Sequence, residues 1–190
     1  TKERSDSSAK LKAHIITSIT LFYQGEFGLV GKHIDRCLAL YDRSLHHEEL
    51  VSSSGYDRGI VSYCWRSMTE WMLGFPDKAL DSSNIAVSIA KELSHPYTTA
   101  VVRAYASWVH RWRGELELSR EHAAAAAAIS HDLGFTLTRV WGTVFEHAAK
   151  LEMGQGDLFS TAASDAAASF RNAGIEIWMP DTLAGVASHY

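Results

Sequence analysis

The sequence predicts an all-α fold, an α-solenoid of helical hairpins with a period of about 40 residues and a right-handed superhelix. The first observation is a set of residue classes that recurs at a step of 40 along the chain: Gly74, Gly114 and Gly154; Trp65, Tyr105 and Phe145; Ala86, Ala126 and Ala166. The second is that no stretch shows the sustained alternation of apolar and polar residues that is typical of strands. The third is the small number of prolines, 3 in 190 residues, which suits long helices.

The pattern predicts the elements in order. Helices are expected near residues 10–24, 27–46, 57–73, 76–92, 97–113, 115–132, 136–153, 157–172 and 180–190. In each hairpin a glycine ends the first helix, and small residues let the second helix pack closely on it. The expected hairpins are 10–46, 57–92, 97–132 and 136–172, with a partial fifth from 180. We expect one helical-repeat domain over 1–190, and, since the chain has no initiator Met and stops inside a predicted helix, a fragment of a longer protein.

The first hairpin departs from the regular step. Its turn glycine, Gly25, lies 49 residues before Gly74, which implies an insertion of about nine residues. The polar, turn-rich segment HHEELVSSSG is the expected place for it. The turn LGFPDKAL and the exit His95-Pro96 favour a tetratricopeptide-like hairpin, although the standard repeat has about 34 residues. HEAT-like repeats, whose period is near 40, are the alternative.

Composition argues against several classes of function. The net charge is −4 and no block of basic residues appears, so we expect no nucleic-acid partner. No apolar run reaches the length of a membrane span, and the polar start TKERSDSSAK is not a secretory signal. Cys37 and Cys64 lack metal-site spacing, which predicts inert core thiols and a cytoplasmic location.

Four longer segments carry a family resemblance. They are GYDRGIVSYCWRSMTEWMLGFPDKAL, AKELSHPYTTAVVRAYASWVHRWRGE, ISHDLGFTLTRVWGTVFEHAAKLEMGQGD and NAGIEIWMPDTLAGVASHY. Over roughly residues 20–190 the chain resembles the C-terminal helical-repeat region of bacterial signalling proteins that join a nucleotide cyclase or DNA-binding domain to an AAA-type ATPase. The resemblance implies a non-catalytic module that binds a partner or signal and regulates the attached domains. KLEMGQGD departs from the family, which has a Trp-Ala-Leu element before this turn.

Polar motifs give little sign of catalysis. His46 and Glu49 of HHEE are three residues apart, so they fit either a divalent cation or a solvated helix end beside the C-terminal dipole. Glu146 and His147 are adjacent and point in different directions. No phosphate-binding glycine loop and no nucleophile elbow is present. We therefore expect no catalytic residue, no metal and no cofactor in this chain.

The tryptophans are the strongest candidates for recognition. In a tetratricopeptide-like array one face of the first helix of each hairpin lines the concave groove, and Trp, Met and Arg are enriched at interface hot spots. On that face the sequence places six candidates: Met68, Trp71, Trp108, Arg111, Trp112 and Trp141. Trp108 and Trp112 are one turn apart beside Arg111, which suggests an aromatic-lined pocket with a cationic rim. The alternative is that the same side chains fill the core between hairpins.

Three functions follow as hypotheses. The first is a binding module whose groove takes a protein or peptide segment. The second is a small-molecule effector sensor with a closed pocket around Trp108 and Trp112. The third, a freestanding enzyme, would need convergent titratable groups, and the repeat alignment places none. The exposed ends of a short solenoid would also favour a homodimer.

Overall fold

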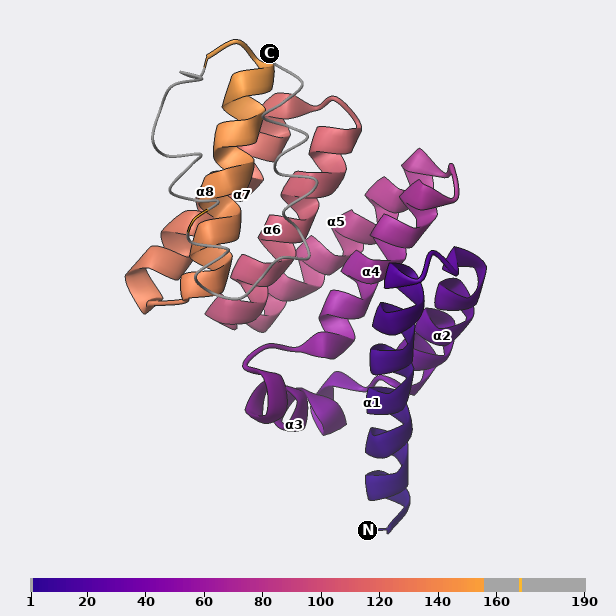
Figure 1. Ribbon diagram of the computed structural model, residues 1–190. Coiled ribbons are helices and arrows are strands. Elements are labelled where there is room, and N and C mark those ends of the chain that lie inside the picture. Colours follow the sequence, from indigo (N-terminus) through magenta and orange to yellow (C-terminus); the bar gives the residue numbers. More distant parts are fainter. Residues whose placement is uncertain (1, 156–167, 169–190) are drawn as a thin grey trace. The chain divides into compact units, whose positions relative to one another are not determined.

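In the computed structural model, residues 2–155 and residue 168 are described, and all regular structure among them is helical (Figure 1). Contacts divide the chain into two compact units, Thr1–Thr98 and Thr99–Tyr190, each of which is described by itself. The helices are α1 (Lys2–Tyr23), α2 (Phe27–Leu40), α3 (Arg43–Ser54), α4 (Arg58–Met72), α5 (Pro76–Leu93), α6 (Pro96–Trp112), α7 (Leu116–Leu133) and α8 (Thr136–Glu152). In this part of the chain the all-α prediction is confirmed.

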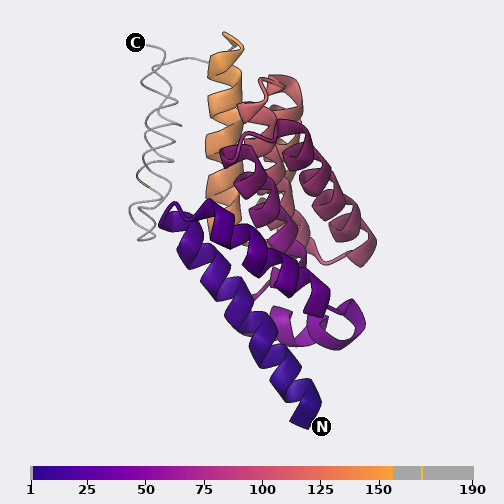
Figure 2. The same cartoon turned by 90° about the vertical axis from the view of Figure 1, so that its right-hand side faces the viewer.

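The first unit contains two helical hairpins and one inserted helix. α1 packs beside α2, and α4 beside α5, as Figure 1 and Figure 2 show. α2 and the short α3 both contact α4. One cluster of buried side chains joins α1, α2 and α3: Leu11, Ile15, Cys37 and Leu50. Burying each large aliphatic side chain of this kind contributes about 1.5–3 kcal/mol to folding.

The second unit contains most of α6, then α7 and α8. α7 carries the alanine run, whose members Ala123 and Ala126 are completely buried. Gly142 of α8 lies against this run so closely that a Cβ built on it would be 2.6 Å from the amide nitrogen of Ala127. The small residues therefore allow a backbone-to-backbone approach of α7 to α8, which is the first helix of the next predicted hairpin.

Five helix ends share one turn geometry. At Gly25, Gly74, Gly114, Gly134 and Gly154 the backbone is left-handed, with φ between 69° and 82°. At Gly114 the glycine amide donates to the carbonyl three residues earlier, at 2.9 Å, and the next amide donates to the carbonyl four residues before the glycine, also at 2.9 Å. This pair of bonds is the Schellman motif, and it recurs at the other four glycines. Ser94 takes the same left-handed region at the end of α5, with φ of 55°.

The predicted boundaries of α4 to α8 agree with the structure to within one residue at each end. The first hairpin requires two corrections. α1 begins at Lys2 rather than near residue 10, and the predicted helix over 27–46 is wrong because α2 ends at Leu40. Asp42 has an extended backbone, and its side chain accepts a hydrogen bond from the amide of Ser44, so a separate helix, α3, starts there.

Some sequence predictions stay predictions. The helices expected over 157–172 and 180–190, and with them the fourth complete hairpin, lie outside the described residues. The single array over 1–190, its 40-residue period and its right-handed superhelix also stay predictions. Among the described helices, none combines the length and the apolar character that a membrane crossing requires.

Candidate functional site

Aromatic rings from α6 and α8 meet along one line in the second unit. The rings of Tyr105 and Trp141 have centroids 5.9 Å apart, and those of Trp108 and Phe145 are 5.1 Å apart. Trp112 continues the line, with its ring 5.5 Å from Trp108. Steps of three and four residues place these side chains on one face of each helix. We call this group of five residues the aromatic seam.

The aromatic seam has a buried row and two more accessible edges. The side chains of Tyr105, Trp108 and Phe145 are buried, whereas Trp112 and Trp141 are half-buried. Aromatic rings whose faces and edges remain partly open offer a large contact area at small entropic cost. The two half-buried tryptophans are therefore the more exposed members of the aromatic seam.

An ion pair lies beside the aromatic seam at the C-terminal ends of both helices. Arg111 Nε donates to Glu152 Oε1 at 2.6 Å, and the two side chains are 11% and 25% exposed. The expected cationic rim therefore carries a neutralising carboxylate. An acidic group of a binding partner would have to compete with Glu152 for the Arg111 guanidinium, because that charge is already paired.

Four of the six candidates from the sequence meet in this region: Trp108, Arg111, Trp112 and Trp141. The other two, Met68 and Trp71, belong to α4 in the first unit. Met68 is 1% exposed and Trp108 is 4% exposed, so both pack in the core instead of facing a groove. This burial removes Met68 and Trp108 from the predicted binding surface, because the hydrophobic face that holds each of them is already covered.

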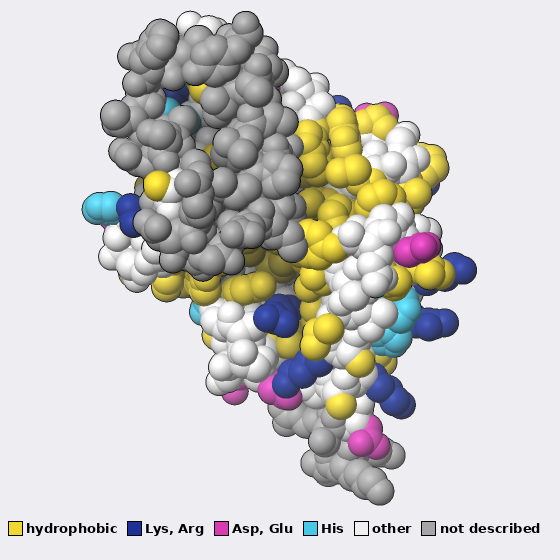
Figure 3. Space-filling model, in the orientation of Figure 1, with side chains coloured by type: hydrophobic (Ala, Val, Ile, Leu, Met, Phe, Trp, Pro, Cys, Tyr) yellow, Lys and Arg dark blue, Asp and Glu magenta, His cyan; other side chains and the backbone are white. Residues whose placement is uncertain are grey.

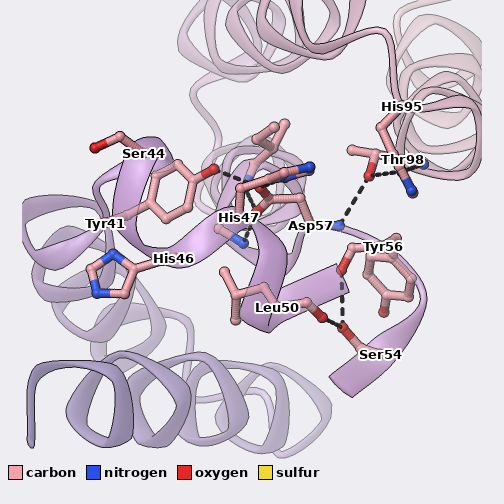
Figure 4. A network of polar contacts seen from close by, with 12 residues as sticks. Tyr41, Ser44, His46, His47, Leu50, Ser54, Tyr56, Asp57, His95 and Thr98 are labelled. Carbon is pink, nitrogen blue, oxygen red and sulfur yellow. Dashed lines mark hydrogen bonds and ion pairs between the residues drawn. The ribbon is translucent and has the colours of Figure 1, made fainter. Parts of the chain in front are cut away.

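A second group of interest is a buried polar network in the first unit, centred on Asp57 (Figure 4). Asp57 is completely buried, and its carboxylate accepts four hydrogen bonds. One oxygen accepts from the Tyr41 hydroxyl at 2.6 Å and from His47 Nδ1 at 2.7 Å. The other accepts from the amides of Gly59 and Ile60 at 2.9 and 3.2 Å, which caps α4.

The network extends from Asp57 to the first turn of α6. The Asp57 amide donates to Thr98 Oγ1 at 3.0 Å, and His95 Nδ1 lies 2.9 Å from the same oxygen. Burial, together with the nearby His47, lowers the pKa of His95 below its ordinary value. Burial and the bond to Asp57 raise the pKa of the Tyr41 phenol. Because every oxygen of Asp57 is occupied, the network fits a structural anchor better than a proton-transfer site.

The histidine and glutamate of HHEE point to different partners. His46 is 3% exposed and its Nδ1 lies 3.0 Å from the Asp42 amide nitrogen. Glu49 instead binds Lys12 Nζ at 2.6 Å and accepts from Ser8 at 2.6 Å. The alternative of a solvated helix end is wrong for His46, because α3 continues to Ser54 and buries that ring.

A third polar group lies at the α6–α7 turn. His110 Nδ1 donates to Glu115 at 2.6 Å, and the His110 ring stacks on His122 with centroids 5.1 Å apart. Burial, with a smaller effect of Arg103 and His110, lowers the pKa of His122 to about 4. Among the residues that the structure describes, no three His, Cys, Asp or Glu side chains are grouped so as to hold a metal ion.

Sequence reasoning missed the Asp57 network. Its side-chain bonds to Tyr41 and His47 and its amide bond to Thr98 join residues 10 to 41 positions apart, and no periodic pattern marks them. One signal was present, since Asp57 directly precedes a predicted helix and Asp is a favoured N-cap. Both cysteines are buried free thiols, as predicted, and burial raises the pKa of Cys37 to about 11.

A comparison of the sequence with protein-family models and with curated proteins finds no match. The resemblance to the repeat region of bacterial cyclase–ATPase proteins therefore stays a prediction.

Proposed function

We propose that this chain is a non-catalytic, tetratricopeptide-like binding module whose hairpins stack with a period of about 40 residues in a right-handed solenoid. The Schellman turns at Gly74, Gly114 and Gly154 support the proposal, because they end three helices at a constant step of 40 with the same two hydrogen bonds. A repeated turn of this kind is what a stack of equivalent hairpins needs at each tip.

The observation that carries the binding role is the aromatic seam. Trp112 and Trp141 are the half-buried members at its two ends, and the Arg111–Glu152 pair lies beside the Trp112 end. Tryptophan and arginine are the residues that most often dominate binding energy at protein interfaces. The occupant we propose is a protein segment that lays apolar side chains on the two tryptophans and a polar group on the ion pair.

The family resemblance supplies the biological setting of the proposal. We propose that the module belongs to a cytoplasmic bacterial signalling protein and that its occupancy regulates an attached ATPase or nucleotide cyclase. Two buried free thiols are consistent with a reducing compartment.

The test is site-specific photo-crosslinking from the aromatic seam. A photoreactive phenylalanine analogue replaces Trp112 in one sample and Leu118, an exposed residue of α7, in the control. In cells of the source organism we expect a protein adduct from position 112 and none of the same mass from 118. The adducted segment, made as a peptide, should bind the purified chain at least about tenfold more tightly than it binds a folded Trp112→Ala variant.

Two results would reject this binding site. One is the same adduct from both positions, which would indicate nonspecific capture. The other is equal peptide affinity for the wild type and for a Trp112→Ala variant whose circular dichroism is unchanged, because the aromatic seam would then contribute nothing.

A further inference from the structure

A hollow of about 150 Å³ opens on the surface of the first unit between α1, α3 and α4. Side chains from all three helices line it: Lys12, Ile15, Ile16, Leu50, Ser53 and Arg58. Figure 3 shows Lys and Arg side chains beside hydrophobic ones between α1 and α3. Every lining residue lies within Thr1–Thr98, so the hollow is a property of one compact unit.

The apolar lining of the hollow is fixed in place by the packing of the core. Ile15 is 2% exposed and Leu50 is 1% exposed, and both belong to the core cluster of α1, α2 and α3. Ile16 lies at the accessible side and is 56% exposed, which makes it the most exposed large hydrophobic residue among those described. A ligand with an apolar body would cover Ile16 and rest on two side chains that are already fixed.

The two cations of the hollow differ in their partners. Lys12 is paired, because its Nζ is 2.6 Å from Glu49 Oε1. Arg58 has no carboxylate partner among the described residues, and its buried Nε atom makes no hydrogen bond. The neighbouring Asp57 cannot supply one, since its oxygens accept from four other donors. A buried donor without an acceptor is costly, and native structures contain few of them.

The side chain of Arg58 indicates which chemical group would act as its acceptor. A guanidinium is planar and always charged, and its donors pair bidentately with the two oxygens of a carboxylate. An enclosed apolar cavity of about 150 Å³ is known to hold a benzene-sized molecule, which sets the scale of the apolar body. A flat nucleotide or a long acyl chain exceeds this size.

We propose that this hollow binds a small monocarboxylate with a short, branched aliphatic body, its carboxylate on Arg58 and its apolar part on Ile15, Ile16 and Leu50. The inserted helix α3 supplies Leu50 and Ser53, so one wall of the hollow comes from the helix that interrupts the regular step of the hairpins. The site is independent of the aromatic seam, which lies in the other unit. It places a small-molecule effector at a different position from the one expected around Trp108 and Trp112.

The probe for the test is 4-methylpentanoate, compared with its neutral primary amide at constant ionic strength. Binding is measured on the whole chain by isothermal titration and by the shifts of labelled isoleucine methyl groups. We expect the acid to bind at least about tenfold more tightly than the amide, with methyl shifts at Ile15 and Ile16. A short peptide ending in leucine carries the same group, and weaker binding of that peptide would identify the free acid as the ligand.

Two variants separate the parts of the site. Arg58→Gln should remove the preference for the acid over the amide, whereas the matched Arg36→Gln on exposed α2 surface should keep it. Ser53→Phe, which fills the hollow without changing charge, should abolish binding of both probes. The proposal is overturned if the wild type does not bind 4-methylpentanoate up to about 10 mM, if the amide binds as well as the acid, or if Arg58→Gln keeps the preference.

Discussion

The close approach of α7 and α8 makes Gly142 a sensitive position, and Gly142→Ala is the substitution that examines it. The added Cβ would lie 2.6 Å from the Ala127 nitrogen, 2.7 Å from the Ala123 carbonyl oxygen and 2.9 Å from the Ala127 Cβ. Two of these three atoms belong to the α7 backbone. A backbone cannot rotate out of the way as a flexible side chain can, so the two helices must separate.

The expected magnitude combines two opposing effects. Overpacking of a tight contact costs about 1–3 kcal/mol of unfolding free energy. Alanine in place of glycine inside a helix returns about 0.8–1 kcal/mol through its higher helix propensity. We therefore expect Gly142→Ala to lower the unfolding free energy by up to about 2 kcal/mol.

Gly31→Ala is the matched control, because Gly31 lies inside α2 and a Cβ there meets no atom within 4 Å. It should gain about 0.5–1 kcal/mol. Both variants are compared with the wild type by equilibrium urea unfolding, followed by far-ultraviolet circular dichroism and by tryptophan fluorescence. If Gly142→Ala is as stable as Gly31→Ala, the contact between α7 and α8 is looser than these distances state.

Three further predictions follow from single residues. Ser94 adopts a left-handed backbone where glycine is free of strain, so Ser94→Gly should raise the unfolding free energy by about 0.5–1 kcal/mol in the same urea assay; a loss would contradict this. Asp57→Asn replaces an acceptor of four hydrogen bonds and should lower the unfolding free energy by about 2–4 kcal/mol. Asp35→Asn, at an exposed ion pair, should lower it by less than about 1 kcal/mol. Equal losses in the two variants would show that the network contributes little. The pKa of His122 is lowered from 6.5 to about 4, so the unfolded chain binds a proton near pH 6.5 that the folded chain does not, and stability falls as the pH drops from 6.5 towards 4. Across that pH range, the unfolding free energy should change less with pH in His122→Gln than in the wild type. The exposed His131→Gln should keep the pH dependence of the wild type. The same pH dependence in His122→Gln as in the wild type would refute the assignment.

The sequence predicts the helices well wherever a turn residue marks their ends. Gly74, Gly114 and Gly154 adopt the left-handed conformation that a Cβ disfavours, and Pro76 begins α5 at the position where a missing amide costs nothing. Local chemistry of this kind can be read from a single chain. It explains why α4 to α8 agree with the prediction to within one residue.

The first hairpin was mispredicted because its apolar pattern is weak. α3 contains HHEE and four serines, a composition that suggests a loop, and only Leu50 and His46 are buried in it. Its end signals were nevertheless in the sequence, with Asp42 as N-cap and Gly55 as a left-handed C-cap. Tertiary burial then stabilises a helix that its own propensities leave marginal.

The candidate site was predicted in part. Spacing places Trp108, Arg111 and Trp112 on one region of α6, and in the structure Trp141 of α8 contacts Tyr105 on the same helix. Which tryptophans are buried depends on the side chains that face them from α8, and a single sequence does not contain that information. The Arg58 hollow has the same origin, since its lining comes from three helices whose packing the pattern does not specify.

The attachment of α3 has a consequence for how the first unit opens. The same Asp57 carboxylate that receives His47 from α3 also holds the Gly59 and Ile60 amides at the start of α4. When α3 detaches, Asp57 therefore loses the hydrogen bond from His47, and Asp57 is the residue that caps the start of α4. Amide hydrogens of α3 and of the first turn of α4 should exchange with solvent in one cooperative event, so the inserted helix belongs to the same opening unit as the hairpin that follows it.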